Sequence, residues 1–209
     1  MIATINGKLS EKHDRDYTPL TAEQKEAMKE DDIKNWEQKA KTGLLKNDEL
    51  LSGIVRKMRN ALYDNVTGVS MNLSAIGITT GSYLDKGKLI INETKLKEAI
   101  QNNPGTVMNL FSKQSDIAKS SSLTPTQRTQ RYNEQGLAYR LSDIVEEYAG
   151  TLGTKGLLLQ KAGMVGDITE FDSLIYDDLK KLNNSIYDFE DKLADKEQTY
   201  YSKFANLEI

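Results

Sequence analysis

The sequence predicts a mainly α-helical fold: a helical bundle with one β-hairpin as its minor β component, and a long C-terminal coiled-coil helix. Apolar residues recur at helical steps of three and four in several separate segments. Between Leu73 and Ile91 this spacing gives way to alternation, which is typical of strands. After Gly166 the chain contains neither Gly nor Pro. The residues beyond it are therefore expected to form one uninterrupted helix.

Three helices are expected in the N-terminal part of the chain. The first carries apolar residues at helical spacing: Ile2, Ile5 and Leu9. The second begins at a capping box, in which Thr21 and Gln24 each satisfy a backbone N–H at the helix start, and it is expected to end at Glu30. The third opens at Asp31 and ends at Gly43, which can adopt the left-handed conformation of a C-cap.

Two further helices are expected, one before and one after the hairpin. Asn47 or Asp48 caps the earlier helix. Its apolar face consists of Leu51, Ile54, Val55, Met58 and Leu62. Asn92 caps the later helix. Its inner face consists of Leu96, Ala99 and Ile100.

The β-hairpin is expected near residues 73–91. Ile76 and Ile78 alternate with smaller residues, and a second apolar run occupies residues 89–91. The turn-like residues 85–87, Asp-Lys-Gly, precede that second run. Two short apolar segments on either side of a turn are the signal of a hairpin.

The second half of the chain alternates between helical and polar segments. Asn103 and Pro104 start a short helix, because Pro fits the first helical position. Residues 113–130 are rich in Ser, Thr and Gln and are expected to form a mobile loop. Residues 136–148 resume as an amphipathic helix, and a Gly-rich passage over 150–166 leads to the C-terminal helix.

The C-terminal helix carries a seam of apolar residues. Asp167 is expected to cap it, with Glu170 completing a capping box. The first seam residues follow alternating steps of four and three: Ile175, Leu179, Leu182, Ile186, Phe189 and Leu193. Strict heptad continuation would place Lys196 and Lys203 in the seam, whereas a step of four to Glu197 continues it. The further members are Tyr200, Phe204 and Leu207. Such a stutter locally unwinds a coiled coil.

These elements predict two parts: a helical domain over residues 1–166, and the long helix over 167–209. The long helix is expected to pair with the helix within residues 1–13 and to continue toward a terminal coiled coil. Pairing of the long helix with a helix of another chain also remains open, because an arm of two paired helices still has an outer surface that a neighbouring chain can contact. The candidate helix-packing or oligomer-interface residues are Ile2, Ile5, Leu9, Leu179, Leu182, Ile186, Phe189, Leu193, Tyr200, Phe204 and Leu207.

The composition excludes several kinds of partner. The formal net charge is −3, and acidic and basic residues are interleaved. No basic block is therefore available for nucleic acid or for anionic lipid. No apolar stretch approaches the roughly 20 residues of a membrane span. The chain has no cysteine, which excludes thiol catalysis, disulfides and thiolate metal sites.

No pattern predicts catalytic, cofactor-binding or metal-binding residues. His13 is the only histidine and lies in a polar segment, so we expect a surface residue and not a triad member. Residues 68–72 lack the second glycine of a nucleophile elbow, and residues 153–156 lack the spacing of a phosphate-binding loop. The aspartates of the C-terminal helix point to several sides of its axis and match no calcium loop. The chain is not expected to be an enzyme.

Three ordered stretches carry a family resemblance. The first runs through Pro19-Leu20-Thr21, Glu23-Gln24-Lys25, Trp36-Glu37, Lys39-Ala40-Lys41 and Gly43-Leu44-Leu45. The second is Ile76-Gly77-Ile78-Thr79-Thr80-Gly81 with Gly87-Lys88-Leu89. The third is Leu193-Ala194-Asp195-Lys196-Glu197 with Tyr200-Tyr201 and Phe204. On these residues the chain resembles the C-terminal region of the bacterial flagellar hook-associated protein 2 family, the flagellar filament cap proteins.

The resemblance implies a secreted structural protein that passes unfolded through the flagellar type III export channel to the tip of the flagellum. There its copies form a ring, in many members of the family a pentamer, that promotes the folding and insertion of exported flagellin. The implied partners are further copies of the chain, flagellin, the filament-junction hook-associated protein and a cytoplasmic export chaperone. The resemblance implies no cofactor.

Compared with the family, the chain is expected to lack the N-terminal arm, the central β domains and the extreme C-terminal tail. It should therefore represent the helical leg domain with part of its coil. Cell adhesion, a further activity considered for a cap, would reside in the missing β domains. The alternative function is a non-enzymatic coiled-coil adaptor or chaperone that holds a cytoplasmic client along the same seam.

Overall fold

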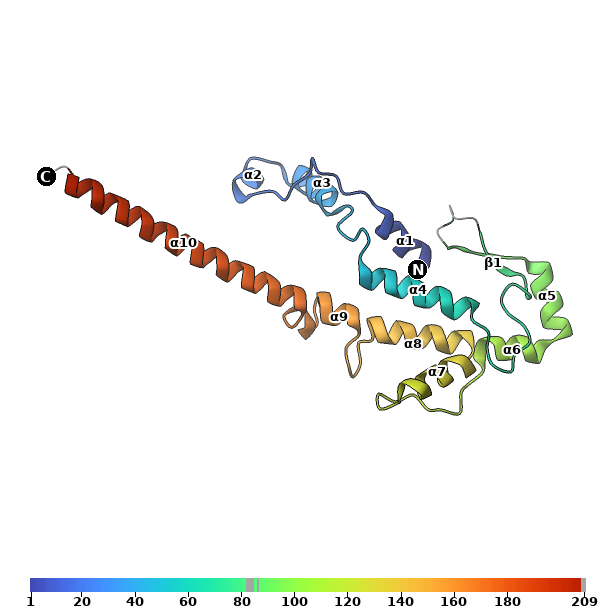
Figure 1. The fold of residues 1–209 in the computed structure, drawn as a ribbon. Coiled ribbons are helices and arrows are strands. Elements are labelled where there is room, and N and C mark those ends of the chain that lie inside the picture. The colour runs from blue at the N-terminus through green and yellow to red at the C-terminus, as the bar shows by residue number, and fades with distance from the viewer. Residues whose placement is uncertain (82–84, 86, 208–209) are drawn as a thin grey trace. The chain divides into compact units, whose positions relative to one another are not determined.

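The computed structural model describes residues 1–81, 85 and 87–207. Over these residues the chain is mainly α-helical, with one two-stranded antiparallel sheet and a long C-terminal helix, so the predicted fold class is confirmed (Figure 1). The chain divides into two compact units, Met1–Ile144 and Val145–Ile209. Each unit is described by itself below.

The helices in chain order are α1 (Ile2–Ser10), α2 (Ala22–Glu26), α3 (Glu30–Lys41), α4 (Glu49–Tyr63), α5 (Glu93–Asn102), α6 (Pro104–Ser112), α7 (Pro125–Glu134), α8 (Leu137–Ala149), α9 (Leu157–Ala162) and α10 (Leu174–Leu207). The strands are β1 (Ile78–Thr80) and β2 (Leu89–Ile91), and a 3₁₀ turn, η2, spans Ile168–Glu170.

The predicted helix starts of the first unit are largely confirmed. Thr21 accepts a hydrogen bond from the N–H of Gln24 at 3.3 Å, and the Gln24 side chain accepts one from the N–H of Thr21 at 2.9 Å. Asp48, not Asn47, caps α4 by accepting from the N–H of Leu51 at 2.9 Å. Asn92 caps α5 in the same way. Local side-chain chemistry therefore sets where these helices begin.

The end of α3 is fixed by a close approach of two backbone segments. The helix ends at Lys41, and Gly43 follows in the left-handed conformation at φ +79°. A Cβ atom at Gly43 would lie 2.4 Å from the backbone N of His13. Only glycine fits here, because the position requires both a positive φ and the absence of a side chain.

The core of the first unit gathers around the segment between α4 and β1. Its buried residues come from that segment, from α6 and from α8: Val66, Leu73, Ile76, Val107, Leu110 and Leu137. The apolar face of α4 adds further buried residues: Ile54, Val55, Met58 and Ala61. Helix α1 packs against α4.

The hairpin is shorter than the sequence predicts. Strand β1 pairs with β2 in the register Ile78↔Ile91, Thr79↔Ile90 and Thr80↔Leu89. Ile76 was expected in the alternating strand, but it lies in a turn before β1 and is 0% exposed. Asn72 caps that turn by accepting from the N–H of Ala75 at 2.9 Å. Of the predicted turn residues 85–87, Lys86 lies outside the described residues.

The expectation of a mobile loop over residues 113–130 is wrong, because residues 125–130 belong to α7. Thr124 and Gln127 form a capping box, and Pro125 occupies the first turn. The preceding segment is also held in place, since the Ser115 hydroxyl donates to Glu134 at 2.6 Å. Helix α7 is polar on nearly every side, and a helix without an apolar stripe resembles a loop in sequence.

Arg140 connects α8 with the ends of two other helices. Its side chain is almost completely buried, at 1% exposed. Its guanidinium donates to five main-chain carbonyl oxygens, at 2.7 to 3.5 Å, those of Ala61, Asp64, Asn65, Tyr132 and Asn133. Two of these distances are 2.7 Å, from the guanidinium to the carbonyls of Tyr132 and Asp64.

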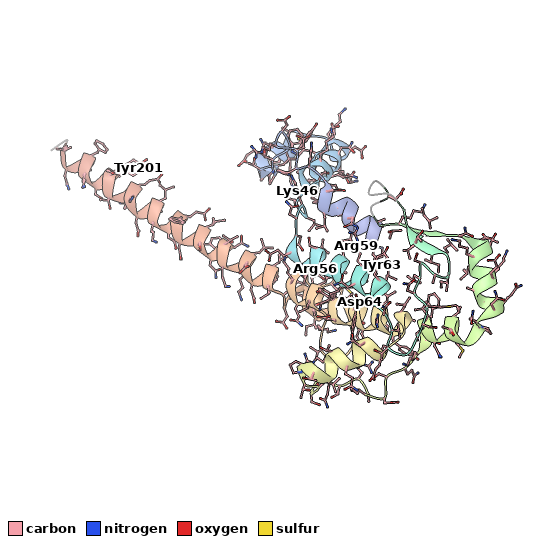
Figure 2. All side chains as sticks on the ribbon, turned by 45° about the vertical axis from the view of Figure 1, so that its right-hand side comes forward. Lys46, Arg56, Arg59, Tyr63, Asp64 and Tyr201 are labelled. Atoms are coloured by element: carbon pink, nitrogen blue, oxygen red, sulfur yellow. The ribbon has the colours of Figure 1, made fainter. Side chains whose placement is uncertain are left out.

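Tyr132 closes the same network from α7. Its ring centroid lies 4.5 Å from the guanidinium carbon of Arg140, and its hydroxyl donates to the Asp64 carboxylate at 2.8 Å. Figure 2 labels Asp64 at the end of α4. Burial, and then the hydrogen bond to Asp64, raise the pKa of Tyr132 to about 12. Burial lowers the pKa of Arg140.

The second unit contains an additional helix and a later start of the long helix than predicted. Residues 150–166 were read as a Gly-rich passage, yet they include α9, whose Leu159 is buried. The long helix starts at Leu174 and not at Asp167. Asp167 caps the short η2 turn by accepting from the N–H of Thr169 at 3.0 Å, and Glu170 accepts from the N–H of Gly166 instead of Asp167. Asp167 and Glu170 therefore belong to the η2 turn and do not form a capping box at the start of the long helix.

We expect Arg140→Met to lower the free energy of unfolding by about 3 kcal/mol or more, because it leaves buried carbonyls without donors. Urea denaturation followed by circular dichroism measures the change. The control is Arg56→Met on α4, an exposed position, where the change should stay within about 0.5 kcal/mol. Equal effects of the two substitutions would contradict the role assigned to Arg140.

We also expect Tyr132 to make stability depend on alkaline pH. Its pKa is higher in the folded chain, about 12, than the ordinary 10.0. Its contribution is therefore fully present below pH 10.0 and is lost as the pH rises toward about 12. In urea titrations over this range Tyr132→Phe should lose less stability than the unmodified chain. The exposed Tyr201→Phe should behave like the unmodified chain, and identical curves for all three would refute the assignment.

Candidate interaction surface

The described residues offer no constellation suited to catalysis. Among them no group of His, Cys, Asp or Glu could hold a metal ion. His13 is exposed, and its Nδ1 lies 3.2 Å from the carbonyl oxygen of Thr42. A surface hollow of about 580 Å³ is lined by Thr67 and residues of α7. Within the part of the chain that the structure describes, no helix has the length and apolar character needed to span a membrane.

The apolar seam of α10 is the main exposed apolar surface of the second unit. The helix has 34 residues, none of them buried, and at 1.5 Å per residue it is about 50 Å long. The seam side chains are between 44% exposed, at Ile175, and 80% exposed, at Leu207. Figure 2 shows side chains projecting from the helix along its whole length, with Tyr201 near its C-terminal end.

The seam follows one line along the helix. At about 100° per residue, the positions from Ile175 to Leu207 fall within an arc of roughly 80°, with Glu197 at its edge. The step of four from Leu193 to Glu197 keeps Phe204 and Leu207 on this line. Burying each large apolar side chain contributes roughly 1.5 to 3 kcal/mol. A partner helix would therefore gain substantially by covering the seam.

The two flanks of the seam differ in chemistry. One flank, here the lysine flank, carries Lys181, Lys192, Lys196 and Lys203 together with Asp178, which pairs with Lys181 at 3.2 Å. The opposite flank, here the glutamate flank, consists of Glu190, Glu197, Tyr176, Tyr187 and Tyr201. Lys192 Nζ lies 5.5 Å from the ring centroid of Phe189, and Lys203 Nζ lies 5.8 Å from that of Tyr200. The lysine side chains thus line the edge of the seam.

The other candidate residues lie in a different setting. Ile2, Ile5 and Leu9 are half-buried on α1, which packs against α4. Leu9 and Val55 line the same shallow surface hollow. The pairing of α1 with the long helix remains a prediction.

The asymmetry of the flanks was missed at the sequence level. The sequence prediction defined the seam by its apolar positions. Lys196 and Lys203 were considered only because a strict heptad would place them in the seam. A projection of residues 174–207 onto a helical wheel separates the two flanks from the sequence alone. The signal was therefore present in the sequence.

The whole of the chain, residues 1–209, matches the family described as flagellar hook-associated protein 2 C-terminus. The chain belongs to the flagellar hook-associated protein 2 family. The resemblance predicted from the sequence is thereby confirmed, and so is the prediction that this is a structural protein and not an enzyme.

Two relatives in this family carry the name flagellar hook-associated protein 2. The protein from Halalkalibacterium halodurans is 31% identical over 218 residues, which cover 99% of this chain and 39% of that protein. The protein from Thermotoga maritima is 26% identical over 212 residues, which cover 98% of this chain and 28% of that protein. The chain thus spans well under half the length of either relative. No solved structure matches it significantly.

Proposed function

We propose that this chain is the C-terminal part of a subunit of the flagellar filament cap. The observation that carries the proposal is the match to the hook-associated protein 2 family over the whole chain. The exposed seam of α10 supports it, because a structural subunit needs a surface on which to assemble. In this proposal the protein is secreted and lies outside the cell at the tip of the flagellum.

The proposed mechanism is positional. Copies form a ring, a pentamer in the proposal, at the filament tip, and each exported flagellin folds and inserts beneath it. The coil that contains α10 rests against the ends of flagellin subunits and must release them as each new subunit enters. Exposed ion pairs contribute only about 0 to 1 kcal/mol each, so charged residues beside the seam, such as Asp188, Lys192 and Glu197, can tune the contact without making it permanent.

The further proposed partners are the filament-junction hook-associated protein and, inside the cell, an export chaperone. The exposed seam also fits the alternative function, an adaptor or chaperone that holds a client helix in the cytoplasm. The two functions differ in location. Intact protein in the culture supernatant of growing cells supports the cap, and its absence supports the adaptor.

We expect a charge within the seam to abolish motility. Ile186→Asp, in the full-length gene of the source organism, should stop swimming in soft agar because a charge at the centre of a helix interface is costly to bury. The variant should still appear in the supernatant. Asn184→Asp, on the opposite side of α10, is the matched control and should swim normally. Unchanged swimming of the Ile186→Asp strain would refute a role for the seam.

We expect deletion of the gene to release flagellin. Without a cap, exported flagellin has no site at which to fold and insert, so the medium should contain abundant unpolymerised flagellin. Electron microscopy should show missing or stunted filaments. Filaments of normal length in the deletion strain would refute the cap function.

A further inference from the structure

A shallow hollow on the surface of the first unit, where α1 packs against α4, carries two arginines. It has a volume of about 250 Å³, and its lining includes Asn6 and Leu9 of α1 and Val55, Arg56 and Arg59 of α4. Figure 2 labels both arginines on the side of α4 along which α1 lies. We call this site the arginine hollow.

The two arginines are exposed and unpartnered. Among the residues that the structure describes, neither Arg56 nor Arg59 takes part in a hydrogen bond or an ion pair. Other arginines of the same unit behave differently, since Arg128, Arg131 and Arg140 each donate to a main-chain carbonyl. A guanidinium has five N–H donors in a fixed fork. In the arginine hollow these donors are available to a ligand.

The surroundings of the arginine hollow are positively charged. Helix α1 contains one charged residue, Lys8, which pairs with Glu11 at 2.8 Å. After Glu49, helix α4 contains no acidic residue and three basic ones: Arg56, Lys57 and Arg59. The chain as a whole has a formal net charge of −3, so this excess of positive charge is local. The hollow therefore favours an anionic ligand and disfavours a cation.

The guanidinium of Arg59 has a restricted position. A Cβ atom at Gly87, which precedes β2, would lie 3.0 Å from Arg59 Nη2 and 3.1 Å from Ile2 Cγ2. The hairpin, α1 and α4 thus approach one another around this side chain. A side chain that is already confined loses less conformational entropy when it binds.

The size and lining of the arginine hollow limit what can occupy it. Pockets for cofactors and drug-sized molecules measure about 300 to 1,000 Å³, so a hollow of about 250 Å³ is better suited to a few side chains of a partner protein. Its base is apolar, because Val55 is buried and Leu9 is half-buried. Inorganic phosphate would leave that base uncovered. A protein segment can supply carboxylates and an apolar side chain together.

The spacing of the arginines matches carboxylates on a helix. Arg56 and Arg59 are three positions apart on α4, so their Cβ atoms lie about 5 to 6 Å apart. Two glutamates four positions apart on a helix have the same separation. Each guanidinium can bind one carboxylate through two parallel hydrogen bonds. A helix that lies in a groove between two other helices is a common mode of recognition.

We propose that the arginine hollow binds an acidic helix of a partner protein. Two carboxylates of that helix, one turn apart, contact Arg56 and Arg59, and an apolar side chain between them contacts Leu9 and Val55. The proposal goes beyond the filament-cap function and does not depend on it.

A synthetic helical peptide tests the proposal. It carries two glutamates four positions apart with a leucine between them, and its binding to the full-length protein of the source organism is followed by fluorescence anisotropy. A matched peptide with glutamines in place of both glutamates should bind at least about tenfold more weakly. Equal affinities of the two peptides, or no binding of the glutamate peptide at about 1 mM, would overturn the proposal.

Charge reversal tests the two arginines. Arg56→Glu and Arg59→Glu should each weaken binding of the glutamate peptide about threefold to tenfold. The double variant should instead bind a third peptide that has lysines in place of the glutamates. Arg15→Glu, at an exposed arginine outside the hollow, is the matched control and should bind like the unmodified protein. Circular dichroism confirms that the variants are folded. Equal losses at Arg15 and Arg56 overturn the proposal.

Two further measurements separate the acidic helix from other occupants. Inorganic phosphate that competes with the peptide at equal concentration indicates a simple anion site and overturns the proposal. The chain spans only part of the length of its relatives, so the peptide is also tested on the 209-residue chain. Binding to this chain but not to the full-length protein means that the rest of the protein covers the hollow, which also overturns the proposal. Either result leaves the filament-cap function untouched, since gene deletion tests that function separately.

Discussion

The packing of the first unit depends on one buried cation that bonds to main-chain oxygens instead of a carboxylate. The last carbonyls of a helix have no partners within the helix. Arg140 of α8 donates to two such carbonyls in the last turn of α7, and to carbonyls in the last turn of α4 and just after that helix. Tyr132 then covers the guanidinium with its ring and reaches Asp64 with its hydroxyl. Three helices are thereby fixed at a single point.

The two units use their apolar residues in opposite ways. In the first unit Ile76, Met58 and Leu110 are at most 2% exposed and form the interior. In the second unit Phe189 is 70% exposed and Phe204 is 64% exposed, and both lie on the surface of α10. Burial of the first set stabilises the chain by itself. The second set is left exposed, so the free energy of burying it is not used within the residues that the structure describes.

The sequence predicted several helices that begin at a capping residue, but it missed a polar helix and the long-range contacts of Arg140. Asp48 and Asn92 mark helix starts through hydrogen bonds to residues three positions later, so both were found. Helix α7 was missed because its polar composition conceals its capping box. The role of Arg140 could not be predicted, because several of its acceptors lie more than seventy positions earlier in the chain, as the carbonyl of Asn65 does. The seam of α10 was predicted, but the helix starts at Leu174, after Ser173, whose hydroxyl accepts from the N–H of Tyr176 at 3.4 Å.

The main-chain character of the Arg140 acceptors has an evolutionary consequence. Every residue type offers the same carbonyl oxygen, so exposed positions such as Asn65 and Asn133 can drift without weakening the network. Conversely, no replacement at those positions can compensate for loss of the arginine, because none of them can remove its own carbonyl. Substitution of Arg140 would therefore have no second-site suppressor among its acceptors, and correlated changes between homologous sequences would leave this contact undetected.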